Sequence, residues 1–469
     1  MLVPMHKIVL GLLITTSIFS CSQKNNKDVG AWIGGQIINP LSDYVLFTKD
    51  GVLIDSLTLD ENNKFLFRID TLKEGLYNFI HEEYQILYLE PGDSLMIRVN
   101  TVEFDESIGY TGIGSARNRF LIDMFLYNEK ESQLLPQFYM LSPQEFTAKA
   151  DSMRSIRVEL MDNLYKKEKL STGFKELAQA NIDYNYFLKL ELYPYAHFGR
   201  NNITLANLPD DYYDFRENID YNSENLQGFY TYYSFLVRHF DHLAYEKYCK
   251  QTTYDPESST HIYHKLEEIH KLVQLESLKN RLLNTAITRF VTTAKYLEKE
   301  NQAVSLFYKY STDESCNARI HELVDASLKM LPGNTVPDIT LENIDGTAIN
   351  IKSVLKKPTV LYFWSVIHVE HHKNIHSKAD ELKQKYPEFD FIAININDDA
   401  QEWKRVISRN NFDKQDEFRF QQPRKSINDL VVNILNKVIV LDSNGVILEN
   451  NTSFFQPNFE EELLGILNK

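Results

Sequence analysis

The stretch from Pro358 to His376 constrains the fold more than any other part of this 469-residue chain. It opens on a continuous apolar run, Val360 to Trp364, and then turns polar with helical spacing. A short apolar run of this kind predicts a fully buried strand that leads directly into a helix. Four of the chain's 13 histidines follow closely, at positions His368, His371, His372 and His376.

A boundary precedes this stretch at Leu331 to Pro337, where two prolines and a glycine end a helical pattern. From there to the C-terminus strands and helices alternate, which predicts a partly parallel sheet. The predicted strands are Thr359–Trp364, Phe389–Asn395, Phe418–Phe420, Lys437–Leu441 and Val446–Leu448. The predicted helices span about residues 371–386, 400–410, 425–431 and 459–467.

Three motifs accompany this alternation: Pro332-Gly333-Asn334 with Pro337-Asp338, Phe363-Trp364, and the turn Leu441-Asp442-Ser443-Asn444-Gly445. Together with the order of elements, they resemble the thioredoxin-like domain of TlpA-type thiol–disulfide oxidoreductases. The resemblance covers about residues 331–469. It implies an α/β thioredoxin-like domain at the C-terminal end of the chain.

The residues at the family's redox site are replaced in this sequence. Alignment on Phe363-Trp364 places His368 and His371 at the positions of the two redox cysteines, and imidazole cannot form a disulfide. Dithiol exchange needs a thiolate at a helix N-terminus and a second thiol to resolve the mixed disulfide. Asn436 stands where the family has a cis-proline, and Tyr362 where many members keep a buried acid. A cis bond before a non-proline residue is costly, so we expect dithiol chemistry to be absent.

The histidines permit a second interpretation. If the helix begins near His368, then His368, His372 and His376 share one face at i, i+4 and i+8. Two imidazoles at i, i+4 can reach one metal ion, and Glu370 adds a carboxylate. No third ligand with dedicated spacing is evident, and histidines also occur at helix starts as solvated or locally packed residues. Both interpretations stay open, and no other cofactor is expected.

The N-terminus predicts an export signal. Lys7 precedes the apolar run Ile8 to Ile14, which is too short to span a bilayer as a stable helix. Ile18-Phe19-Ser20-Cys21 resembles a bacterial lipobox, whose cysteine is lipidated and becomes the first residue. We expect residues 1–20 to be removed, Cys21 to carry lipid and residues 21–29 to act as a tether. An ordinary signal peptide with an incidental cysteine is the alternative.

Two further domains are expected between the tether and the thioredoxin-like region. Residues 30–115 alternate apolar and polar positions between turns such as Asp50-Gly51, which predicts an antiparallel β-sandwich or barrel. With Leu89–Asp93 and Phe104–Ser107, this stretch resembles the N-terminal domain that precedes thioredoxin-like domains in envelope lipoproteins. Residues 116–330 have helical spacing and few glycines or prolines, which predicts a helical domain. The fold class is therefore multidomain α+β.

These observations favour a binding protein over an enzyme. The net charge of −15 argues against a nucleic-acid partner. We expect a TlpA-like lipoprotein without a redox dithiol, anchored through Cys21 to the outer membrane, facing the periplasm or cell surface, that binds an envelope protein or peptide. One alternative is an oxidoreductase that uses Cys249 or Cys316, which could also form a structural disulfide or remain two unrelated thiols. The other is a metal-binding envelope protein.

Overall fold

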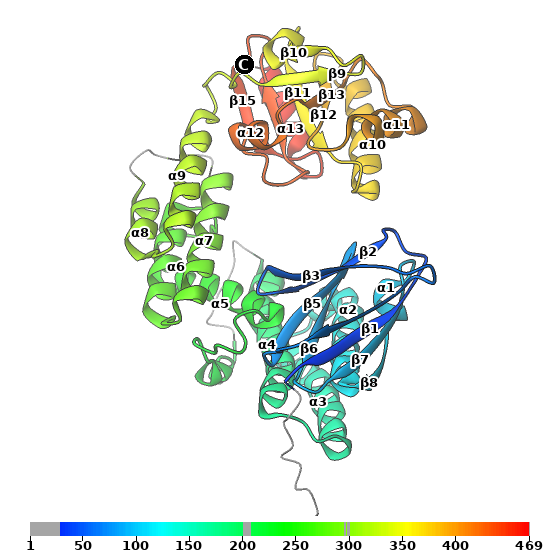
Figure 1. Cartoon of the computed structure of the whole chain (residues 1–469). Coiled ribbons are helices and arrows are strands. Elements are labelled where there is room, and N and C mark those ends of the chain that lie inside the picture. The colour runs from blue at the N-terminus through cyan, green and yellow to red at the C-terminus, as the bar shows by residue number, and fades with distance from the viewer. Residues whose placement is uncertain (1–28, 200–207, 295–296, 298–300, 469) are drawn as a thin grey trace, which may run out of the picture. The chain divides into compact units, whose positions relative to one another are not determined.

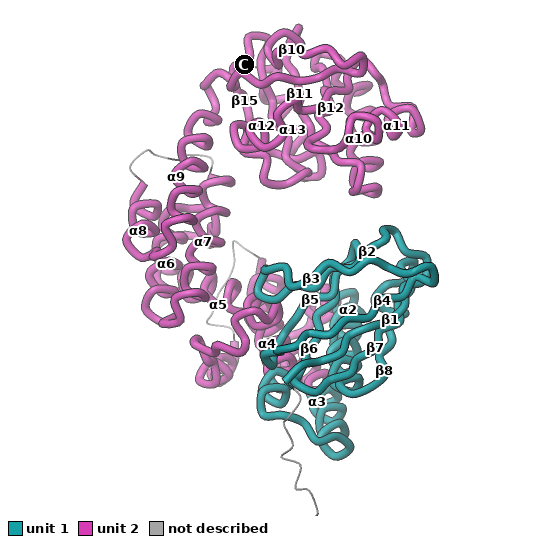
Figure 2. Tube along the Cα trace, in the orientation of Figure 1, with its two compact units in different colours: residues 1–134, 155–179 teal, residues 135–154, 180–469 magenta. Residues whose placement is uncertain are grey.

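The computed structural model describes residues 29–199, 208–294, 297 and 301–468. The predicted signal peptide, Cys21 and most of the tether lie outside the described residues. The chain divides into two compact units, which Figure 2 colours separately. The first comprises Met1–Leu134 and Ser155–Gln179, and the second comprises Leu135–Arg154 and Ala180–Lys469. Helical sequence therefore contributes to both units.

Two four-stranded sheets form the β part of the first unit, with strand orders β4-β1-β7-β8 and β3-β2-β5-β6. All pairings are antiparallel except that of β1 with β7, which is parallel. This confirms the predicted antiparallel β domain, with one parallel pairing as its exception. The strands are β1 Ala31–Ile38, β2 Tyr44–Lys49, β3 Val52–Thr58, β4 Lys64–Ile69, β5 Gly75–His81, β6 Glu83–Leu89, β7 Ser94–Asn100 and β8 Gly109–Ile113.

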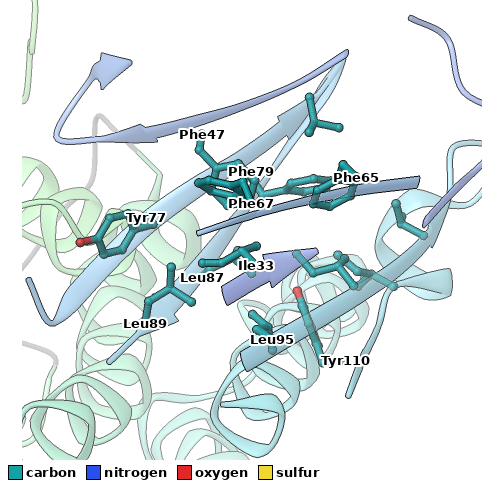
Figure 3. Packing of buried hydrophobic residues seen from close by; sticks show 14 of the residues in the cluster. Ile33, Phe47, Phe65, Phe67, Tyr77, Phe79, Leu87, Leu89, Leu95 and Tyr110 are labelled. Carbon is teal, nitrogen blue, oxygen red and sulfur yellow. The ribbon is translucent and has the colours of Figure 1, made fainter. Parts of the chain in front are cut away.

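An aromatic cluster fills the space between the two sheets (Figure 3). The ring of Phe47 lies 4.7 Å from that of Phe67, and Phe65 stacks on Phe79 at 5.6 Å. Because side chains alternate across a strand, every second residue of these strands points into this core. Aromatic burial of this size supplies much of the hydrophobic stabilisation of the β domain.

Three long helices follow the short helix α1 (Phe104–Ser107): α2 Ser115–Phe138, α3 Pro143–Lys167 and α4 Thr172–Phe198. The buried side chain of Asn118 in α2 makes two hydrogen bonds to the backbone of Tyr88 on the edge strand β6. Its Oδ1 accepts from the Tyr88 N–H at 2.8 Å, and its Nδ2 donates to the Tyr88 carbonyl at 3.0 Å. The helix thereby closes a strand edge that would otherwise present unpaired backbone groups.

The second unit continues with the helical region that the sequence predicted (Figure 1). A buried ionic network holds part of it together. The carboxylate of Glu191 accepts two hydrogen bonds from Arg216, at 2.9 and 2.8 Å, and lies 2.7 Å from Nδ1 of His239. Its remaining helices are the 3-10 helix η2 Asp214–Asn218, α5 Tyr230–Tyr248, α6 Ser259–Leu272, α7 Glu276–Thr293, α8 Gln302–Tyr310 and α9 Glu314–Lys329.

A seven-stranded mixed sheet forms the C-terminal part, in the order β10-β9-β13-β12-β11-β14-β15. The strands β11, β12 and β13 run parallel, as the alternating pattern predicted. The strands are β9 Thr340–Asn343, β10 Ala348–Asn350, β11 Thr359–Trp364, β12 Asp390–Asn395, β13 Glu417–Phe420, β14 Val438–Leu441 and β15 Ile447–Thr452. The helices are η3 Ile351–Val354, α10 Val369–Lys385, α11 Ala400–Asn410, α12 Pro423–Asp429 and α13 Phe459–Leu467.

Every residue of β11 is buried, because the strand is central and each face carries an apolar cluster. Leu361 and Phe363 pack into one cluster, and Tyr362 and Trp364 into the other, beside α10. The continuous apolar run in the sequence reflects this burial on both faces. Within the described residues, no helix combines the length and apolar character needed to cross a membrane.

The substitution Phe47→Ala should lower the free energy of unfolding by about 3–5 kcal/mol, because it removes a fully buried ring and leaves a cavity. Urea denaturation followed by circular dichroism measures the change. The control is Tyr44→Ala, on the same strand but 43% exposed, which should cost far less. Equal losses for the two variants would contradict the assigned core.

Candidate functional site

The candidate site lies where β11 ends and α10 begins. Ser365 is still buried, and the chain then emerges at Ile367 and Val369, which are 73% and 53% exposed. The helix begins at Val369, with the exposed His368 as its N-cap residue, whose side chain makes no capping hydrogen bond. The free N–H groups of the first helical turn therefore open toward solvent at this point.

The tertiary structure brings His371 and Asn436 together, although they are far apart in the sequence. His371 is half-buried in the first turn of α10, and burial lowers the pKa of its imidazole, an effect that the neighbouring Asn436 side chain partly offsets. Asn436 lies shortly before Val438 of β14, which pairs with Tyr362 of β11. All peptide bonds of the described residues are trans.

Asp398, at the carboxyl end of β12, fixes the loop between β11 and α10. Its Oδ1 accepts from the Ser365 hydroxyl at 3.0 Å, and its Oδ2 accepts from the Val366 N–H at 2.5 Å. The Asn395 side chain donates to the same Oδ2 at 2.6 Å. Sequence reasoning missed this residue. The available signal was its position, since the carboxyl ends of neighbouring parallel strands meet at one edge of a sheet.

His372 and His376, two of the three predicted metal ligands, are buried within the domain. The Nδ1 of His372 faces the Ser365 carbonyl at 3.4 Å, and burial lowers the pKa of this imidazole. The Nδ1 of His376 donates to the His372 carbonyl at 2.6 Å, since a carbonyl oxygen can only accept. Its ring stacks on Phe412 with the centroids 3.7 Å apart.

The placement of these histidines gives no support to the metal hypothesis. Both ring nitrogens of His376 already have partners inside the protein, and His368 sits in solvent at the helix N-cap. Within the described ranges, no group of three or more histidine, cysteine or carboxylate side chains is arranged to hold a metal ion. The i, i+4 spacing of histidines on one helical face is therefore not enough to make a metal site here, because that face packs against the rest of the domain.

Glu417, at the start of β13, is the buried acid of this domain and was also missed. Its Oε1 lies 2.8 Å from Nε2 of His376, and its Oε2 accepts from the Trp364 indole N–H at 3.2 Å. Burial raises the pKa of this carboxyl, and the contact with His376 acts in the opposite direction. Because His376 Nδ1 carries a hydrogen, the contact at Nε2 needs one further proton, shared between imidazole and carboxyl.

Lys437, directly after Asn436, is a third residue that the sequence did not single out. Its ammonium is buried and donates to the carbonyls of Leu430 and Val431, at 3.2 and 2.8 Å. Burial lowers the pKa of this lysine to about 7. The contacts tie the segment that carries Asn436 to the C-terminal end of α12, whose carbonyls attract a cation.

The two cysteines of the described residues lie in the helical region. Cys249 and Cys316 are both free and half-buried. Cys249 follows α5 and Cys316 lies in the first turn of α9. Neither residue is part of the segment around His368 and His371, so no thiol of the described residues lies in that segment.

Residues 356–447 match a family model described as thioredoxin-like, and this segment is therefore a thioredoxin-like domain. No curated protein matches the chain. Among solved structures, the chain is similar to the thioredoxin domain of a thiol-disulfide oxidoreductase from Bacteroides vulgatus. The sequence identity is 14% and the TM-score is 0.24, and the match covers 29% of this chain and 95% of that chain. A thiol:disulfide interchange protein from Bacteroides sp. has 14% identity, coverage of 30% and 90%, and a TM-score of 0.24.

The substitution Glu417→Gln should change how stability depends on pH. A carboxyl whose pKa is raised by folding stabilises the protein fully below its unfolded pKa, and this contribution is lost as pH rises through the folded pKa. The variant lacks that titration, so its stability relative to the wild type should increase from about pH 4 upward. Denaturation at several pH values, with the exposed Glu388→Gln as control, measures this. A difference that stays constant with pH would contradict the assignment.

Proposed function

We propose that this protein is a membrane-anchored lipoprotein of the cell envelope whose thioredoxin-like domain binds a protein or peptide segment without exchanging thiols. The observation that carries the proposal is the composition of the site. The helix N-terminus that would activate a thiolate has His368 at its N-cap and His371 in its first turn. Cys249 directly follows α5 and Cys316 lies in the first turn of α9, so both belong to another region of the chain.

The surface around this helix start has the chemistry of a binding site. Ile367 and Val369 are exposed apolar side chains, and Ile434, two residues before Asn436, is 56% exposed. Asn436 lies beside His371, so its loop flanks the same helix start. Exposed apolar groups next to unsatisfied backbone donors suit a partner that supplies apolar side chains and carbonyl oxygens.

The predicted anchor supports the location of this function. If Cys21 is lipidated, a short tether joins the lipid to β1, which begins at Ala31. Lipidation would keep the protein at the outer membrane, facing the periplasm or cell surface, in reach of envelope proteins. The redox alternative would need Cys249 and Cys316 to pair or cycle, and the two are free and half-buried on different helical segments.

Insulin reduction tests the absence of dithiol chemistry. With dithiothreitol as reductant, the purified mature protein should leave the rate of insulin precipitation at the level of the reductant alone, because imidazole forms no mixed disulfide. The double variant His368→Cys with His371→Cys is the positive control. It places two thiols at a helix start and should acquire measurable turnover. Turnover by the unmodified protein above the background rate would overturn the proposal.

Alkylation read by intact mass tests the role of the remaining thiols. Both Cys249 and Cys316 should react under denaturing conditions without prior reduction, since both are free. Reduction before alkylation should therefore add no further label. Two additional labels after reduction would show a disulfide between them and would favour the alternative in which these cysteines form a redox pair.

A further inference from the structure

The outer face of the sheet β4-β1-β7-β8 carries an exposed apolar strip. Its members are Trp32, Leu66, Met96 and Ile113, which are 42%, 59%, 37% and 62% exposed. Figure 3 shows Ile33, Leu95 and Tyr110 of the same strands among the inward-pointing side chains of the core. The strip therefore lies on the opposite face from the core, and its burial is not needed to close the β domain.

The register of the strands makes this strip continuous. Gly34 of β1 pairs with Leu66 on one side and with Met96 on the other. A Cβ atom at Gly34 would lie 2.7 Å from Cδ1 of Leu66 and 3.1 Å from Sδ of Met96, so the two side chains close over the glycine. Ser94 pairs with both Trp32 and Ile113, which extends the strip to the edge strand.

Cations surround the strip, and the outward strand positions hold no acid. Lys64 and Arg98 both pair in register with Gln36, and Arg68 pairs with Trp32. All three cations are exposed, and Arg68 also contacts Asp70, just beyond the end of β4, at 3.0 Å. The outward positions are Trp32, Gly34, Gln36, Ile38, Lys64, Leu66, Arg68, Ser94, Met96, Arg98, Asn100, Gly109, Thr111 and Ile113. The charge of this face is therefore opposite in sign to that of the whole chain, which has 65 acidic and 50 basic residues.

We propose that this face docks onto a lipid bilayer that contains anionic phospholipid. The face combines an indole, aliphatic side chains and a thioether with lysine and arginine. This composition suits the interfacial region of a bilayer, where apolar groups enter the headgroup layer and cations pair with phosphates. The proposal rests on the anchored location proposed above. Trp32 follows Cys21 by eleven positions, a span of at most about 40 Å when fully extended. A lipid on Cys21 would therefore hold this sheet next to the membrane.

Trp32 provides a direct probe of docking. The other two tryptophans of the chain, Trp364 and Trp403, are fully buried, so only the emission of Trp32 is open to a quencher. The mature lipid-bearing protein is placed in vesicles of phosphatidylcholine with phosphatidylglycerol and a spin-labelled lipid quencher. We expect a blue shift and loss of most Trp32 emission. Both should weaken at high salt and in vesicles of phosphatidylcholine alone.

Two double variants test whether quenching depends on this face or on exposed apolar residues in general. Leu66→Ser with Ile113→Ser should reduce the quenching several-fold, and both side chains are exposed enough for the fold to tolerate the change. The matched control is Val52→Ser with Leu53→Ser on β3, at 67% and 55% exposure, which should leave quenching unchanged. Near-ultraviolet circular dichroism checks that all variants are folded.

The outcomes distinguish docking from anchoring. Flotation of the protein with vesicles reports the lipid anchor, and quenching of Trp32 reports the sheet face. A protein that floats while Trp32 stays unquenched overturns the docking proposal and leaves the anchor intact. Quenching after simple mixing with vesicles, without stable flotation, supports docking and contradicts the anchor. A blue shift that grows with protein concentration in the absence of lipid overturns docking in favour of a second copy of the chain.

Discussion

A single buried carboxylate, Glu417, joins the elements on which the candidate site is built. It holds the imidazole of His376 from α10 and the indole of Trp364 from β11 at the same time. A buried charge is costly unless it is paired, so this carboxyl and its shared proton fix the helix against the sheet. This contact acts together with the buried apolar residues of α10, Ile375, Ala379 and Leu382, to hold the helix that begins next to His368.

Apolar packing, rather than the chemistry of the helix start, stabilises this fold. A thioredoxin-like domain needs a buried central strand and a helix that starts beside it, and both are stabilised here by apolar packing on the two faces of β11. Dithiol exchange needs two thiols at the helix start, which contribute little to that packing. A chain with histidines at this helix start can therefore keep the scaffold, here with an exposed apolar loop held by Asp398.

Much of the fold could be predicted from local patterns. The apolar run of β11, the alternation around Leu95 to Val99 and the prolines before β9 each have one physical interpretation, and the structure follows them. The proximity of His371 and Asn436 was implied by the family resemblance. Asp398 could have been found from its position after a parallel strand. Glu417 and Lys437 could not be predicted, because an isolated charged residue looks solvated in a sequence and its burial depends on strands that are distant along the chain.

The sequence by itself determined that the segment from Pro358 to His376 contains four histidines and no cysteine, since no fold changes which residues a segment carries. Only the tertiary structure decided what its histidines do. His372 and His376 have the spacing of metal ligands, but His376 is turned toward Glu417 and Phe412 by the packing of α10 on the sheet. The reason is physical: spacing fixes which side chains share a helical face, whereas hydrogen-bond partners and burial fix the use of that face.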